Sequence, residues 1–145
     1  MKKLLSLLVV FFAFVGMSMA QNGAEINFEK DTHNFGKIAY MSDGTYEFVF
    51  TNTGNEPLII SSCKGSCGCT VPVWPKEPIM PGESNVIKVK YDTKRAGKPF
   101  KKSVTVNSNA STAQKTIYIK GRVGEKPSDD AFPAKKSSDF SPAAG

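Results

Sequence analysis

Three cysteines lie within segment 63–69, which reads CKGSCGC. Thiolates are the nucleophiles of disulfide exchange and the ligands that soft metal ions prefer, so this segment carries the densest chemistry of the chain. An odd number of cysteines leaves at least one thiol unpaired within a monomer. The simplest expectation is therefore a structural segment, in which Cys63, Cys67 and Cys69 form one local disulfide and leave one thiol over.

The spacing leaves the disulfide pairing open. In an extended chain the Cα atoms of Cys67 and Cys69 lie about 6.6 Å apart, at the upper edge of disulfide geometry, and a turn at Gly68 shortens that distance. We expect a bridge across one residue to be strained and easily reduced. A bridge from Cys63 to Cys67 or Cys69 closes a looser loop through Gly65.

Two functional alternatives exist for the same three cysteines. Three thiolates on a glycine-rich loop could hold Cu(I), or Zn(II) if His33 came close as a fourth ligand. Alternatively, one thiolate attacks a disulfide and another resolves it. The spacing matches neither the Cys-x-x-Cys redox pattern nor a paired zinc-finger pattern.

The rest of the chain gives little support for catalysis. His33 is the single histidine, and we expect it in a solvent-facing loop between two early strands. No Ser, His and acid stand in a recognisable nucleophile arrangement, and no glycine-rich phosphate loop opens a helix. We therefore predict no enzymatic activity and no catalytic residues.

Basic side chains gather near one expected turn, in segment 94–102, which holds Lys94, Arg95, Lys98, Lys101 and Lys102. Such a cluster could meet an anionic glycan or a lipid headgroup, although lysines on a solvated sheet also block edge-to-edge pairing, which is the simpler explanation. The chain has 19 basic and 13 acidic residues. Removing Lys2 and Lys3 with an export signal leaves 17 against 13, or +4, which is too small to indicate nucleic-acid binding.

The first twenty residues have the features of an export signal. Lys2 and Lys3 precede an apolar run from Leu4 to Val15, and small residues end the segment at Ala20. The run is shorter than the roughly 20 residues that span a bilayer. We expect cleavage after Ala20 and a mature protein, not membrane-spanning, in the periplasm or outside the cell, where thiols tend to oxidise.

The mature chain alternates between apolar and polar residues with a period of two, and Gly, Pro, Asn or Asp bound each stretch. The clearest strands are 46–52, with aromatic side chains on one face, and 86–91, with Lys88 and Lys90 on the outer face. Further strands are expected at 26–28, 58–61, 103–107 and 116–123, and weaker ones at 35–38 and 70–74. About seven short strands predict an antiparallel β-sandwich over residues 21–124. The Pro- and Ser-rich residues 125–145 predict a disordered tail.

Trp74, between Pro72 and Pro75, has two interpretations. It either fills the core or stands exposed as a binding aromatic, and the area that a tryptophan buries favours the core.

An ordered set of motifs also resembles a known family. These motifs are NFGKI at 34–38, FTNTGNEPLII at 50–60, SCGCT at 66–70, IMPGE at 79–83, GKPFKKSVTV at 97–106 and IKGRV at 119–123. In that order, over about residues 26–123, they resemble the bacterial family called domain of unknown function 1573. Cys63 lies outside its Cys-Gly-Cys motif.

The resemblance implies an immunoglobulin-like sandwich, similar to the ASPM, SPD-2 and Hydin domain and to the major sperm protein and pilus chaperone sandwiches. It implies an exported binding module and no catalytic residues. We therefore expect a partner that is a protein or an envelope component, bound through an added strand or a loop end. The sequence specifies neither the partner nor the oligomeric state.

Overall fold

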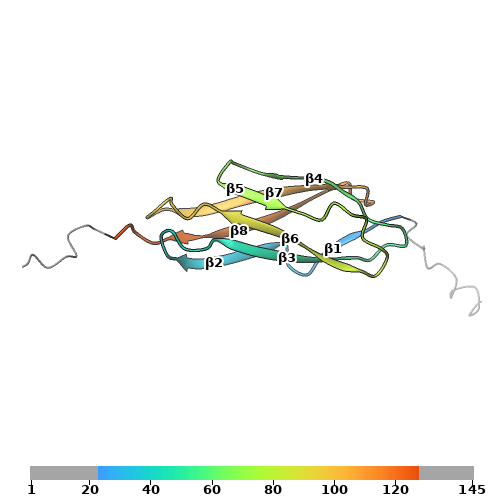
Figure 1. The fold of residues 1–145 in the computed structure, drawn as a ribbon, viewed down its shortest axis with the longest axis horizontal. Helices are drawn as coiled ribbons and strands as arrows, with labels where there is room; N and C mark the ends of the chain where they lie inside the picture. Colours follow the sequence, from blue (N-terminus) through green and yellow to red (C-terminus); the bar gives the residue numbers. More distant parts are fainter. Residues whose placement is uncertain (1–22, 128–145) are drawn as a thin grey trace, which may run out of the picture.

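A computed structural model describes residues 23–127 (Figure 1). The predicted signal peptide and most of the predicted tail lie outside these residues. The described chain forms eight strands: β1 (Ile26–Phe28), β2 (Thr32–Ile38), β3 (Thr45–Asn52), β4 (Ile60–Gly65), β5 (Thr70–Val73), β6 (Ser84–Tyr91), β7 (Pro99–Ser108) and β8 (Gln114–Val123). No helix long and apolar enough to cross a membrane occurs among the described residues.

The strands form two four-stranded sheets that pack face to face. One sheet has the order β1-β3-β6-β5 and the other has the order β2-β8-β7-β4. The prediction of an all-β sandwich is confirmed, with eight strands in place of about seven. The period-two alternation has the expected cause, because the central strands β3, β6, β7 and β8 bury one face against the opposite sheet.

The central strands supply the core. Phe48 and Phe50 of β3 pair with β6, which turns Ile87 and Val89 inward, and all four side chains are fully or almost fully buried. From the second sheet, β7 and β8 contribute Val104, Val106, Ile117 and Ile119 to the same core. On the outer face Lys88 forms an ion pair with Glu47, at 2.9 Å between Nζ and Oε1.

One strand pairing departs from the antiparallel expectation. β2 runs parallel to β8, with an irregularity between Asn34 and Lys37 where Gly36 has a positive φ of 62°. The chain does not reverse between β1 and β2, and instead it switches sheets within three residues (Figure 1). Keeping its direction, it meets β8 in parallel.

A buried polar residue fastens the loops at one end of the sandwich. Asn52, the last residue of β3, is fully buried. Its Oδ1 accepts hydrogen bonds from the backbone N–H groups of Glu25 and Gly54, at 3.3 and 3.0 Å. Its Nδ2 donates to the backbone carbonyls of Glu56 and Ile79, at 2.7 and 2.9 Å. One side chain therefore ties together the chain before β1 and the loops after β3 and β5.

Candidate functional site

The cysteine motif forms the connection between the two sheets. β4 lies at the edge of one sheet and β5 at the edge of the other, and residues 66–69 cross between them. We call residues 66–69 the cysteine crossover. The expected strand 58–61 is displaced, because Leu58 forms only an isolated bridge with Ile79 and β4 begins at Ile60. Cys63 consequently lies within a strand.

Within the cysteine crossover, Cys67 is bonded to Cys69. Their Cα atoms are 5.3 Å apart, shorter than in an extended chain and within the ordinary range for a disulfide. The backbone turns at this point, and the Thr70 N–H donates to the Cys67 carbonyl at 3.1 Å. The looser loop that a Cys63 bridge would close does not form, because the turn at Gly68 brings the nearer pair together.

Cys63 is the leftover thiol. It is buried in the core, and this burial raises the pKa of Cys63 to about 12, against a smaller lowering effect from Lys76. Cys67 is half-buried and Cys69 is buried. A thiol with so high a pKa carries almost no thiolate at neutral pH, which makes Cys63 a poor nucleophile.

The cysteine crossover is held at both of its ends. The Ser66 N–H donates to the Ser103 carbonyl at 2.8 Å, and the Ser103 N–H donates to Ser66 Oγ at 3.2 Å. At the other end the Asp92 N–H donates to the Cys69 carbonyl at 2.9 Å. These bonds attach the cysteine crossover to β7 and to the residue that follows β6.

His33 does not join the cysteines. It lies in β2 rather than in a loop, half-buried, with its ring stacked on Tyr46 at 3.5 Å between centroids and edge-on to Phe35 at 4.5 Å. Burial, and secondarily Lys30, lower the pKa of His33. β2 and the Cys63 strand β4 are opposite edges of one sheet, about 14 Å apart at three strand spacings.

The metal prediction therefore applies only to a reduced chain. Among residues 23–127 no three His, Cys, Asp or Glu side chains are placed to hold a metal ion. Cu(I) or Zn(II) binding by Cys63, Cys67 and Cys69 requires thiolates, whereas here two of the three sulfurs are bonded to each other.

Trp74 combines features of both interpretations given for it. Its half-buried ring packs against the core, and the Lys76 Nζ lies 3.2 Å from the ring centroid. Its indole Nε1 is buried and finds no hydrogen-bond partner among the described residues. The ring is thus mainly a packing group at the margin of the core.

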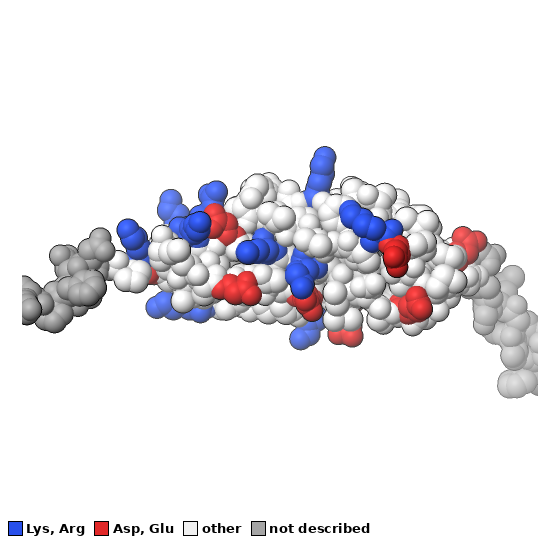
Figure 2. All heavy atoms as spheres, in the orientation of Figure 1, with Lys and Arg blue, Asp and Glu red and all other residues white. Residues whose placement is uncertain are grey.

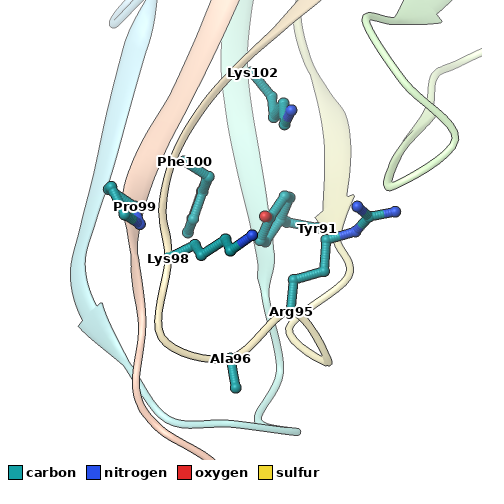
Figure 3. A pocket seen from close by; sticks show the side chains of 7 residues that line it. All are labelled: Tyr91, Arg95, Ala96, Lys98, Pro99, Phe100 and Lys102. Atoms are coloured by element: carbon teal, nitrogen blue, oxygen red, sulfur yellow. The ribbon is translucent and has the colours of Figure 1, made fainter.

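A pocket lies next to the cysteine crossover, between the end of β6 and the start of β7 (Figure 3). Its volume is about 360 Å³, and seven residues line it: Tyr91, Arg95, Ala96, Lys98, Pro99, Phe100 and Lys102. We call this cavity the basic pocket. The rings of Tyr91 and Phe100 stack at 3.8 Å between centroids, with 15° between their planes.

Three cations line the basic pocket near Tyr91. Figure 3 shows Lys98 reaching toward the Tyr91 ring, Arg95 rising on the other side with its guanidinium directed away from Lys98, and Lys102 standing above them. Burial raises the pKa of Tyr91, Arg95 opposes that rise and Asp92 adds to it. The sequence indicated the basic cluster, but not the aromatic pair beneath it. Tyr91 belongs to the core face of its strand, and nothing in the pattern pairs it with Phe100.

The charges are distributed unevenly along the molecule. On the face shown in Figure 2, basic side chains gather toward the left end, where β8 ends, while the right tip carries acidic ones. The residues of this basic end come from the ends of β2, β6 and β8, the start of β7 and the loop before it: Lys37, Lys90, Lys94, Arg95, Lys98, Lys101, Lys102, Lys120 and Arg122.

A family model described as Protein of unknown function (DUF1573) matches residues 26–123. The chain belongs to this family. The match covers every strand of the sandwich, so the family resemblance and the observed fold describe the same residues. No curated protein matches the sequence.

Solved structures of proteins with low sequence identity share the fold of this DUF1573 member. A protein of unknown function from Porphyromonas gingivalis W83 superposes with a TM-score of 0.62 at 17% identity, covering 75% of this chain and 50% of that one. The PapD-like domain 7 of human CEP192 gives 0.57 at 7% identity, covering 72% and 89%. The CsuC–CsuE chaperone and tip adhesion subunit complex of Acinetobacter baumannii gives 0.51 at 13%, covering 69% and 57%. The immunoglobulin-like, PapD-like sandwich is thereby confirmed.

Proposed function

We propose that this chain is a non-enzymatic, exported binding module of the bacterial envelope that recognises an acidic partner through its basic end. The observation that carries the proposal is the concentration of cations around a pocket at one end of the sandwich. A module of this fold appears in the CsuC–CsuE pre-assembly complex, where a chaperone binds an adhesion subunit. Like-charged side chains gathered in one place attract an oppositely charged surface and favour its encounter.

The sheet edges favour a loop-end surface over strand addition. β1 has three residues, and β5 has four and contains Pro72. β2 and β4 both carry register shifts in their pairing with the neighbouring strand. Short strands, prolines and bulges are the devices that prevent a sheet edge from accepting another strand. The loop end carries no comparable obstruction, and it holds the basic pocket.

Charge neutralisation tests this function. We expect a variant with Lys94→Gln, Lys101→Gln and Lys120→Gln to capture its partner from a bacterial envelope fraction at least tenfold less than the unmodified chain at low salt, because it loses three charges of the basic end. Captured protein is quantified by mass spectrometry.

The control removes the same charge elsewhere, through Lys30→Gln, Lys64→Gln and Lys115→Gln. These residues lie outside the basic end, so capture should be unchanged. Equal losses in both variants, or no protein captured by the unmodified chain, would contradict the proposal.

A second candidate function is thiol–disulfide exchange at Cys67–Cys69. Of the two bonded sulfurs, that of Cys67 belongs to the more exposed residue. An incoming thiolate from a substrate dithiol attacks Cys67 Sγ, and Cys69 leaves as a thiolate that takes up a proton. The second substrate thiol then displaces Cys67, so the substrate is oxidised to a disulfide and this chain gains two electrons. A bridge across one residue restrains the unfolded chain by only about 1.6 kcal/mol, so it contributes little to stability.

Thiol counting with a redox titration tests the second candidate. Without reductant, we expect alkylation to label one cysteine per unfolded chain and almost none per folded chain at pH 8, because burial raises the pKa of Cys63 to about 12. A reduction potential above about −230 mV would agree with exchange, and one below about −300 mV would mark a structural bridge.

Intact mass of the reduced chain after addition of Cu(I) or Zn(II) tests the metal alternative, with a Cys67→Ser, Cys69→Ser variant as its control.

A further inference from the structure

We infer that the basic pocket binds the phosphate group of a small phosphate monoester. The inference deepens the proposed function, since it names the chemistry recognised at the centre of the basic end. The volume of the basic pocket, about 360 Å³, falls at the lower end of the range of small-molecule sites. This volume suits a ligand of about the size of one sugar phosphate.

The cations of the basic pocket have no acidic partner within the described chain. The one ion pair among residues 23–127 joins Lys88 to Glu47 on the outer face of the sheet. The nearby Asp92 uses its Oδ1 to accept the backbone N–H of Lys94, at 3.1 Å. Arg95, Lys98 and Lys102 therefore line the cavity without an ion pair to any described residue. A ligand with two negative charges would supply the missing counter-charge.

The phenol of Tyr91 adds an unused hydrogen-bonding group. The residue is only 4% exposed, and its hydroxyl makes no hydrogen bond to any other residue of the described chain. Tyr91 lines the basic pocket, so this hydroxyl is free to bond to a ligand. A phosphate oxygen in the basic pocket can accept a hydrogen bond from this hydroxyl.

The type and the number of the donors favour phosphate over a single carboxylate. An arginine guanidinium presents a planar fork that binds two oxygens of a phosphate, and lysine ammonium groups add point charges. Arg95, Lys98 and Lys102 bring three cations to the lining of one cavity, and the Tyr91 hydroxyl adds a neutral donor. Ala96 and Pro99 form a less polar wall for the rest of the ligand.

The aromatic pair of the basic pocket and the backbone beside it are held by contacts within the chain. The stacked rings of Tyr91 and Phe100 join β6 to β7. The cysteine crossover bonds to Ser103, next to Lys102, and to Asp92, next to Tyr91. A pocket whose backbone is held in place in advance loses less entropy when it orders around a ligand.

Isothermal titration and amide chemical shifts at low ionic strength test the inference, with glucose 6-phosphate, inorganic phosphate and glucose as probes. We expect both phosphates to bind and to shift the amides of Tyr91 and Phe100, and glucose to do neither. Lys98→Gln with Lys102→Gln should weaken binding of glucose 6-phosphate at least tenfold. Tyr91→Phe, which keeps the ring stack, should weaken it several-fold.

The matched control is Lys64→Gln with Lys115→Gln, which removes the same charge outside the basic pocket and should leave binding of glucose 6-phosphate unchanged. Absence of phosphate binding, or equal weakening in the pocket and control variants, would overturn the inference. If either result is obtained but capture from the envelope fraction still depends on the basic end, the phosphate inference fails and the proposed function stands.

Vesicle binding distinguishes two ligands that carry the same phosphate group, a free sugar phosphate and a lipid headgroup. The probe is phosphatidylcholine containing one-fifth phosphatidic acid, compared with phosphatidylcholine alone. Binding that needs phosphatidic acid and is lost in the Lys98, Lys102 variant assigns the basic pocket to a headgroup, whereas glucose 6-phosphate binding without vesicle binding assigns it to a free ligand. Vesicle binding without any binding of the small phosphates would overturn the inference.

Discussion

Replacing Asn52 with alanine is expected to lower the free energy of unfolding by about 4 kcal/mol, because four backbone groups lose their hydrogen-bond partner. The N–H groups of Glu25 and Gly54 and the carbonyls of Glu56 and Ile79 all bond to this side chain. Leaving a buried polar group unsatisfied costs about 1–3 kcal/mol. The loss is large beside the 5–15 kcal/mol that stabilises a typical domain.

Urea denaturation of the mature chain, followed by the fluorescence of its single tryptophan, measures the effect. Asn85→Ala serves as the control, because Asn85 is exposed and its side chain accepts only the neighbouring Val86 N–H, at 2.8 Å. We expect the control to change the stability by less than about 0.5 kcal/mol. A loss below about 1 kcal/mol in Asn52→Ala would show that other groups or water replace the side chain.

Gly65→Ala is expected to cost about 3 kcal/mol, because there is no room for a side chain where β4 meets the cysteine crossover. A Cβ at Gly65 would overlap the backbone carbonyl oxygen of Thr70. That oxygen belongs to β5, which pairs with β6, so relief requires one strand to move. Overpacking of this kind ordinarily costs 1–3 kcal/mol, and contact with backbone places the effect near the upper limit.

A second glycine of the same segment provides the comparison. At Gly68 a Cβ would meet no atom within 4 Å and φ is not positive, so Gly68→Ala should be neutral or stabilise the fold by up to about 1 kcal/mol. Thermal and urea unfolding of both variants, with the Cys67–Cys69 bridge verified by intact mass, measures the difference. Equal stability of the two variants would contradict the steric argument.

The sequence predicted the elements that bury a regular face. In β3 and β6 the inward positions are apolar apart from Asn52, and their neighbours are polar or solvated, so the alternation alone located the core residues Phe48, Phe50, Ile87 and Val89. The family motifs predicted the same sandwich. These predictions succeed because burial against a second sheet imposes a period of two on the sequence.

The predictions fail where the position of a residue depends on a contact with another part of the chain. β2 has the sequence THNFGKI, in which apolar and polar residues do not alternate. No alternation is needed, because backbone pairing with β8 rather than a buried face holds this edge strand. The sequence therefore predicts a loop for His33, whereas it lies in β2. The choice of the Cys67–Cys69 bridge depends on the turn at Gly68. The basic pocket depends on Tyr91 and Phe100, which meet only because the intervening loop folds back. Apart from the glycine at position 68, none of these arrangements leaves a local pattern.

The parallel pairing of β2 with β8 has a mechanical consequence. The two ends of the described chain leave from opposite ends of the long axis, and β2 and β8 run in the same direction along it (Figure 1). Tension between these ends pulls β2 backward and β8 forward, so the hydrogen bonds between them are loaded in shear and share the force. In an unzipping geometry they would break one after another. A module tethered on both sides would resist stretching through this pair of strands.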